Sequence, residues 1–280
     1  MMLEVKNLTF GYNRRQNVFE NFSLSLSEGK VYGLLGKNGT GKSTLLYLMT
    51  GLLRPSKGGC YYQEIDVKLR KPQTLREMFI VPEEFSLPKV SMKQYAELYR
   101  PFYPRFSDEL LRSCLDKFDM NADIYLGELS MGQKKKAYMC FALATNTPLL
   151  VMDEPSNGLD IPSKSQFRRA IATGMTDEKA IVISTHQVRD IDSLLDHVII
   201  IDNNRILLDR SVSEICSRLR FTESPTGQIA GNELYVQPSI QGNSVILPNT
   251  ETEEESLLNL ELLFNGILAE REKIQAVFND

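Results

Sequence analysis

Hydrophobic and polar residues alternate near the start of the chain in a pattern that predicts strands. Residues 3–10, LEVKNLTF, are rich in strand-forming side chains, and Phe22, Leu24 and Leu26 alternate with serines. A strand with one buried face shows this period of two. We therefore expect residues 1–35 to form strands and turns, of which the last is a short apolar strand at residues 31–35.

Apolar runs then alternate with helical patterns along the chain. Strands are predicted at residues 149–152, 180–183, 198–201 and 205–208. Residues 85–135 are instead aromatic, charged and helical in pattern, and Ser107 is typical of a helix N-cap. The apolar side of that helix would hold Leu110, Leu111, Cys114, Leu115 and Phe118. Strands that alternate with helices indicate a mostly parallel sheet.

Composition changes after Leu219. The segment FTESPTGQIAGN at residues 221–232 has the composition of a linker. Two short strand candidates, ELYVQ and SVILP, follow it, and then an acidic run and a helix candidate. That helix would place Leu260, Leu263, Phe264, Ile267 and Leu268 on one face. The tail is too small to form a core of its own, so it should dock on the main domain or on a partner.

A glycine-rich segment, GKNGTGKS at residues 36–43, joins the strand at residues 31–35 to a helix that begins near Lys42 and ends near Gly51. It matches the pattern G-x-x-x-x-G-K-[ST] in the strand–loop–helix context that a phosphate-binding loop requires. Glycines let backbone N–H groups close around phosphate oxygens, and the helix N-terminus adds partial positive charge. Lys42 would reach the β- and γ-phosphates, and the Ser43 hydroxyl would ligate Mg²⁺. The context disfavours the alternative, an ordinary glycine turn.

Two adjacent acids end the apolar strand LLVMDEP at residues 149–155. Buried acids are costly unless they meet cations or take part in chemistry. An aspartate that holds Mg²⁺ and a glutamate that orients water would explain Asp153 and Glu154. A strand end that is simply capped by acids is the alternative.

Further segments lie in the order typical of ATP-binding-cassette (ABC) ATPases. LSMGQ at residues 129–133 resembles the family's signature, SNGLD at residues 156–160 its D-loop, and STHQ at residues 184–187 the segment of its switch histidine. Tyr12 lies where the family has an aromatic residue that stacks on adenine. Over residues 1–220 the chain therefore resembles the ABC ATPase family.

The resemblance implies an α/β fold, in which a P-loop NTPase (RecA-like) core carries an N-terminal antiparallel β subdomain. An α-helical signature subdomain would be inserted at about residues 85–140. This ABC ATPase domain would span residues 1–220. A linker at residues 221–232 would lead to a small C-terminal extension at residues 233–280, made of a β-hairpin and a helix.

The resemblance also implies roles for individual residues. Tyr12 would stack on the adenine of ATP, Glu154 would be the general base, and His186 would contact the γ-phosphate and steady the attacking water. Mg²⁺ would be held by Ser43, Glu83 and Asp153. The phosphates would be bound by Gly36, Lys37, Asn38, Gly39, Thr40, Gly41, Lys42, Ser43 and Thr44. ATP held by the opposite subunit would be contacted in trans by Ser130, Gly132 and Gln133, with Asp160 linking the two sites.

Two positions depart from the family pattern. Glu83 follows the strand MFIV, where the family usually has a glutamine that reports the nucleotide state to the membrane partner. Its carboxylate still offers oxygen to Mg²⁺ or to a bound water, and it adds negative charge beside the γ-phosphate. Met131 replaces a frequent glycine of the signature, whose other members Ser130, Gly132 and Gln133 are retained.

Other residues have simpler interpretations. The run Lys134, Lys135 and Lys136 predicts a solvated helix face, with a role for one lysine near the phosphates as the alternative. His197 is interpreted as structural, and Tyr12 taken alone would also suit a core aromatic residue. No metal or redox spacing relates the cysteines, so all are predicted to be small buried hydrophobic residues: Cys60, Cys114, Cys140 and Cys216.

Composition limits the partners. The net charge of −4 argues against nucleic acid, which usually calls for a basic face. No apolar run approaches the ~18 residues that cross a bilayer, and the N-terminus lacks a cleavable signal pattern. We therefore expect a cytoplasmic protein that binds peripherally to the inner face of the cell membrane through separate integral-membrane transporter subunits.

The resemblance predicts an ATPase that powers an ABC transporter together with a second ATPase subunit, identical or different. Export is favoured because the FYPRF segment, the charged helix before LSMGQKKK and the tail are similar to bacterial exporters with separate membrane subunits. The alternative is a soluble ABC ATPase in an assembly role such as iron–sulfur cluster biogenesis. DNA-maintenance and ribosome-binding ABC proteins fit less well, because the chain lacks a long coiled-coil insertion and a second cassette. The C-terminal helix either covers the ATPase core or joins the dimer contact, and the second interpretation is favoured.

Overall fold

A six-stranded sheet forms the centre of the computed structural model, which describes residues 1–13, 15–225, 231–239, 242–249 and 256–278. The strand order is β10-β9-β3-β8-β7-β6, and only the pairing of β10 with β9 is antiparallel. The strands are β3 (Lys30–Leu35), β6 (Met78–Val81), β7 (Leu149–Asp153), β8 (Ala180–Thr185), β9 (His197–Asp202) and β10 (Arg205–Ser211). The predicted mostly parallel sheet is therefore confirmed, and the carboxyl ends of β3, β7 and β8 share one edge.

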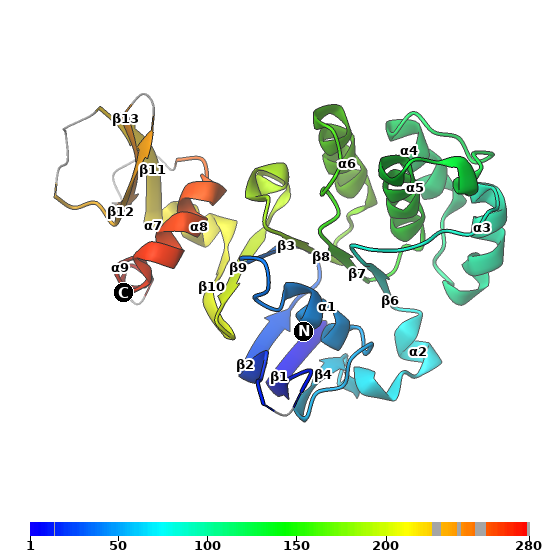
Figure 1. The fold of residues 1–280 in the computed structure, drawn as a ribbon, viewed down its shortest axis with the longest axis horizontal. Helices are drawn as coiled ribbons and strands as arrows, with labels where there is room; N and C mark the ends of the chain where they lie inside the picture. The colour runs from blue at the N-terminus through cyan, green and yellow to red at the C-terminus, as the bar shows by residue number, and fades with distance from the viewer. Residues whose placement is uncertain (14, 226–230, 240–241, 250–255, 279–280) are drawn as a thin grey trace.

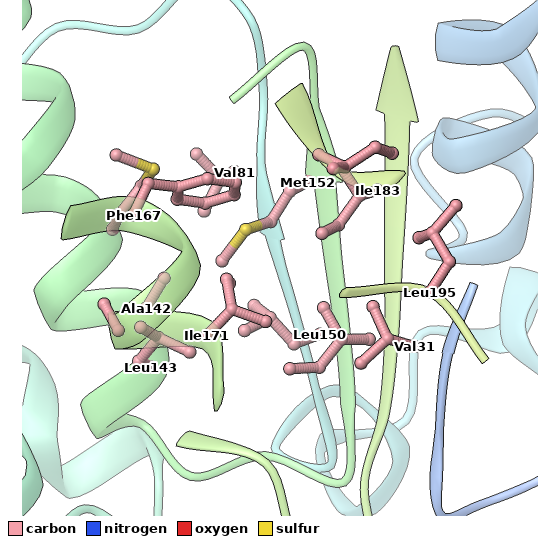
Figure 2. Close-up of a cluster of buried hydrophobic side chains, with 14 of the residues drawn as sticks. Val31, Val81, Ala142, Leu143, Leu150, Met152, Phe167, Ile171, Ile183 and Leu195 are labelled. Atoms are coloured by element: carbon pink, nitrogen blue, oxygen red, sulfur yellow. The ribbon is translucent and has the colours of Figure 1, made fainter. Parts of the chain in front are cut away.

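The central strands read as continuous apolar runs because both faces of the sheet are covered. Every residue of β7 and β8 is buried. On one face, side chains such as Leu150, Met152 and Ile183 pack against Phe167 and Ile171 of a covering helix (Figure 2).

The helices of that face are α3 (Met92–Tyr99), α4 (Asp108–Lys117), α5 (Met131–Ala144) and α6 (Ile161–Gly174) (Figure 1). The predicted helix start at Ser107 is confirmed, since its hydroxyl accepts a hydrogen bond from Leu110 N at 3.1 Å.

The opposite face is covered by α1 (Lys42–Met49) and by a four-stranded antiparallel sheet of order β2-β1-β4-β5. Its strands are β1 (Leu3–Phe10), β2 (Phe19–Leu26), β4 (Lys57–Tyr62) and β5 (Ile65–Asp66). Phe22, Leu24 and Leu26 are buried, as their alternation with serines predicted. Helix α1 ends before Gly51, whose φ of 69° is easiest for glycine. The expected N-terminal antiparallel subdomain is therefore present.

Short elements connect these layers and complete the chain before the tail. They are η1 (Val67–Leu69), α2 (Pro72–Leu75), η2 (Arg100–Phe102), η3 (Leu126–Glu128), η4 (Val188–Asp190), η5 (Asp192–Leu194) and α7 (Val212–Arg218). No helix of the described residues is both long enough and apolar enough to span a membrane.

The C-terminal tail forms a small sheet of order β11-β13-β12 beside the β10 edge of the main sheet (Figure 1). Its strands are β11 (Leu219–Ser224), β12 (Tyr235–Ser239) and β13 (Gly242–Pro248), and it is followed by α8 (Leu260–Ala269) and α9 (Arg271–Ala276). Two expectations are corrected. Residues 221–224 belong to β11 and not to a linker, and β11 turns the predicted hairpin into three strands, because it pairs with β13 along its whole length. The predicted linker residues 226–230 and the acidic run at residues 251–255 lie outside the described residues.

Helix α8 packs its apolar side into the same hydrophobic cluster as the main sheet and the helices α3 to α6. Leu263 and Ile267 are fully buried there, and Gln275 of α9 donates a hydrogen bond from Nε2 to the carbonyl oxygen of Leu207 at 2.6 Å. These contacts fit the interpretation that the tail covers the core. The favoured alternative, a role in the dimer contact, stays a prediction.

An aromatic cluster packs the helices of this face against the sheet. Phe141 lies at its centre and should contribute strongly to the free energy of unfolding. Phe141 is fully buried, with ring centroids 4.7 Å from Tyr95, 5.6 Å from Phe106 and 5.8 Å from Phe79. We expect Phe141→Ala to lower the free energy of unfolding by about 3–5 kcal/mol, as large cavities do. Urea denaturation measures this change. Phe102→Ala, at an exposed ring of η2, is the control and should change stability by less than about 0.5 kcal/mol.

Candidate functional site

The loop between β3 and α1 is tightly packed at two of its glycines. A Cβ atom on Gly36 would lie 2.6 Å from Thr40 Oγ1 and 2.7 Å from the carbonyl oxygen of Ile201. Gly41 has a φ of 98°, and a Cβ atom there would lie 2.9 Å from Cζ of Phe19. Larger residues would force the loop open, so these glycines keep the backbone in a closed ring before the helix.

Lys42 lies inside this ring. Its ammonium donates hydrogen bonds to the carbonyl oxygens of Gly36 at 2.9 Å and Lys37 at 3.2 Å. The same nitrogen lies 3.5 Å from Oε1 of Glu154, and only 6% of the lysine is exposed. The structure thus brings a buried cation of the glycine-rich loop to Glu154, the acid that directly follows β7.

Tyr12 lies beside the start of α1. Its hydroxyl shares a hydrogen bond of 3.0 Å with Oγ1 of Thr44, and its ring makes an edge contact with Phe10 at 5.1 Å. Because Tyr12 is 66% exposed, the core-aromatic alternative is wrong. The exposed ring is free to stack on a planar group next to the loop.

Asp153, the last residue of β7, and Glu154, which follows it, have different surroundings. Asp153 is buried, and its Oδ1 accepts a hydrogen bond from Ser184 Oγ at 2.5 Å. Glu154 is also buried, has a φ of 45° and places Oε1 2.9 Å from Nδ1 of His186. A left-handed backbone is uncommon for glutamate and often marks a functional site. Strand pairing of β7 with β8 explains how residues 32 positions apart meet.

The three residues proposed for Mg²⁺ offer oxygen ligands, which hard cations prefer. No ion pair of the described residues reaches the buried Asp153, so its charge suits a bound cation. Glu83 is exposed and accepts a hydrogen bond from Nδ2 of Asn157 at 3.1 Å. Burial raises the pKa of Tyr47 on α1, and the charges of Asp153 and Glu83 add to that shift. The described residues include no cluster of three protein ligands, and phosphate and water oxygens would have to complete the coordination.

The signature segment begins α5. Ser130 is its N-cap and accepts a hydrogen bond from Gln133 N at 3.3 Å, while Gln133 Oε1 accepts one from Ser130 N at 3.0 Å. Gly132 has open space around it, because a Cβ atom there would meet only the carbonyl oxygen of Gly158, at 3.8 Å. In the described part of the chain no hydrogen bond or ion pair joins Ser130 or Gln133 to the residues at 36–44. This helix N-terminus is therefore exposed and available to a second molecule.

Asp160 caps the next helix. Its Oδ1 accepts a hydrogen bond from Ser163 N at 2.9 Å, and this interaction with Ser163 lowers the pKa of the Asp160 carboxyl. The neighbouring Ile161 is strongly exposed. The D-loop and the signature thus both present surface residues.

The interpretation of the lysine run was wrong for Lys135. Only 6% of Lys135 is exposed, and its ammonium donates hydrogen bonds of 2.9 Å to the carbonyl oxygens of Glu154 and Asn157. Burial lowers the pKa of Lys135, while the charges of Glu83, Glu154 and Asp153 oppose that shift. The missed signal was helical spacing, because Lys135 lies on one face with the buried Met139 and Ala142 at i+4 and i+7.

The chain was compared with known proteins. Residues 19–157 match the family model described as ABC transporter. The chain carries an ABC transporter ATP-binding domain. Domains of this family are ATPases, and the predicted fold class and ATP-hydrolysing activity are thereby confirmed.

Similar proteins agree on the domain. YtrB, an ABC transporter ATP-binding protein of Bacillus subtilis (strain 168), is 22% identical over 265 residues, covering 92% of this chain and 90% of its own. MetN, a methionine import ATP-binding protein of Carboxydothermus hydrogenoformans, is 28% identical over 234 residues, which cover 76% of this chain and 67% of MetN. CbiO1 of Clostridium perfringens, described as part of the ABC transporter complex cbiONQ, has a TM-score of 0.64 at 23% identity over 76% of this chain and 90% of its own. Since MetN is an import protein by name, the ABC domain does not distinguish export from import.

Proposed function

We propose that Glu154 is the general base of this ABC ATPase and that Lys42 and His186 position the γ-phosphate and the attacking water. The observation that carries this proposal is their convergence: the carboxylate of Glu154 lies 2.9 Å from His186 Nδ1 and 3.5 Å from Lys42 Nζ. Glu154 and His186 directly follow β7 and β8, and Lys42 is the first residue of α1 after the loop that leaves β3. Phosphoryl transfer depends mainly on such positioning and on charge neutralisation.

The glycine-rich loop binds the triphosphate in this proposal. Its backbone N–H groups and the N-terminus of α1 face the phosphates, and Lys42 exchanges the carbonyl oxygens of Gly36 and Lys37 for phosphate oxygens. The exposed ring of Tyr12 stacks on the base. Ser43, Asp153 and Glu83 hold Mg²⁺, which neutralises negative charge on the phosphates when it is bound.

A second ATPase subunit completes the site. The exposed Ser130 and Gln133 and the half-buried Gly132 at the start of α5, together with Asp160, contact ATP held by the partner subunit. ATP then stabilises the closed pair, because its phosphates satisfy donors of both chains. Hydrolysis removes contacts that exist only in the closed state, and the pair opens.

The pair is proposed to act on separate integral-membrane subunits at the cytoplasmic face of the membrane, and to drive export. The support for a complex is the family of the ABC domain and the similarity to CbiO1, a part of a transporter complex. The support for export is the resemblance of the tail and the FYPRF segment to bacterial exporters with separate membrane subunits. Co-purification with a multi-spanning membrane protein is expected. Co-purification with soluble assembly factors alone would favour the iron–sulfur alternative.

The trans arrangement is testable by cysteine crosslinking, because the four native cysteines are buried. Asn38→Cys and Ser130→Cys are introduced on separate copies that also carry Glu154→Gln, and both positions are exposed. With ATP the two chains should crosslink into a dimer band, and with ADP the band should be weak. The measurement is the dimer fraction on non-reducing gels.

Ser217→Cys, at an exposed serine of α7, replaces Ser130→Cys in the control. Its yield with Asn38→Cys should be low with either nucleotide. Equal yields for the Ser130 and Ser217 variants in ATP would contradict the sandwiched arrangement.

A further inference from the structure

Lys135 connects the signature helix α5 to the turn that follows β7. It lies in the second turn of α5, between the half-buried Lys134 and Lys136. Lys136 places its ammonium 6.0 Å from the ring centroid of Phe118, whereas the Lys135 ammonium points into the protein and binds two carbonyl oxygens. Of the three lysines only the middle one is buried.

The two carbonyl oxygens belong to one tight turn. The carbonyl oxygen of Glu154 also accepts a hydrogen bond from Asn157 N at 3.2 Å, so the Lys135 ammonium closes a turn that begins at the proposed base. Glu154 is in the left-handed region, which a neighbouring structure must maintain. Without the ammonium, both carbonyl oxygens would lose a charge-assisted hydrogen bond.

Glu83 reaches the same turn from the other side. Its carboxylate accepts a hydrogen bond from the side chain of Asn157, whose carbonyl oxygen binds Lys135. Glu83 is also the foremost of the charges that stabilise the ammonium of Lys135 against burial. A buried cation is unfavourable unless hydrogen bonds and opposite charges surround it, and this one has both.

We propose that Lys135 is a positioning residue for ATP hydrolysis. Its ammonium holds the main chain of Glu154 in place, ties the signature helix α5 to the D-loop, and offsets the negative charge that Glu83 brings to the site. The proposal rests on the role of Glu154 as base. Because α5 begins with the residues that meet the partner's ATP, the same lysine links one nucleotide site to the other.

Lys135→Met keeps the apolar stem and removes the ammonium. We expect kcat for ATP hydrolysis to fall about 30-fold, since small displacements of a catalytic group have effects of this size, while Kd for ATP stays within about 3-fold of the unmodified protein. Lys134→Met, at the adjacent position with no buried partner, is the matched control and should keep kcat within about 2-fold. Kd is measured by nucleotide titration without Mg²⁺, and melting temperatures confirm that both variants are folded at the assay temperature. A kcat for Lys135→Met close to that of Lys134→Met would overturn the proposal.

A double-mutant cycle isolates the charge coupling and remains informative if Lys135→Met unfolds. Lys135→Gln is compared in two backgrounds, with Glu83 and with Glu83→Gln. The loss of kcat caused by Lys135→Gln should be about 10-fold smaller when Glu83 is already neutral, because the lysine then has less charge to offset. A merely structural lysine would give the same loss in both backgrounds, and that result would overturn the coupling.

Glu154→Gln, measured in parallel, distinguishes a failure of the positioning role of Lys135 from a failure of the proposed role of Glu154 as base. If Glu154→Gln abolishes turnover and the Lys135 variants behave like the unmodified protein, only the positioning role fails. If Glu154→Gln turns over normally, the proposed role of Glu154 fails first.

Discussion

Replacing Glu154 with glutamine is expected to slow ATP turnover by at least about 100-fold, the scale of losing a positioned general base. Glutamine keeps the shape of the side chain and an oxygen that can face His186 Nδ1. In the unmodified protein this nitrogen lies 2.9 Å from Oε1 of Glu154. It loses the negative charge that would draw a proton from the attacking water. Binding depends on the glycine-rich loop, so Kd for ATP should change by less than about 3-fold.

Steady-state phosphate release and a separate nucleotide titration measure the two quantities. Glu128→Gln removes one carboxylate from an exposed position before the signature and should leave kcat within about 2-fold. Near-normal turnover of Glu154→Gln would reject Glu154 as the base.

Lys42→Ala is expected to have the second large effect, on binding. A charged hydrogen bond is worth about 1.5–3 kcal/mol, so its loss should raise Kd for ATP about 10- to 100-fold. The loss of ATP affinity is increased here because Lys42 is buried, with its nitrogen 3.5 Å from Oε1 of Glu154. Alanine leaves that carboxylate without its cation beside the phosphates.

The measurement is equilibrium titration with ATP, with circular dichroism to show that the variant is folded. Lys57→Ala removes the same charge from an exposed position of β4 and should leave Kd within about 2-fold. Unchanged affinity in Lys42→Ala would count against the phosphate-binding role of the loop.

Local sequence patterns predicted the sheet well. The continuous apolar runs before the glycine-rich loop, before Asp153 and before His186 are β3, β7 and β8. Such runs are informative because a strand covered on both faces needs apolar side chains at every position. The order of the motifs then indicated that Asp153, Glu154 and His186 belong to one site. Only the structure shows the reason, which is that β7 and β8 pair and end at the same edge of the sheet.

The tail shows where local patterns fail. Residues 221–224 have the composition of a linker, yet they form part of β11 because β13 lies alongside and supplies hydrogen-bond partners. Pairing of this kind joins residues 19 to 25 positions apart, and no short window of sequence contains both strands.

The sequence by itself determined the class of this protein, because a phosphate-binding loop, a signature and an acidic strand end are each made by consecutive residues whose chemistry is local. The tertiary structure alone decided that Lys135 is buried under Glu154 and Asn157, and that Glu83 meets Asn157. A lysine in a charged run is solvated or buried according to what packs over its side of the helix. That covering surface comes from residues far along the chain, so burial is a property of the fold and not of the run.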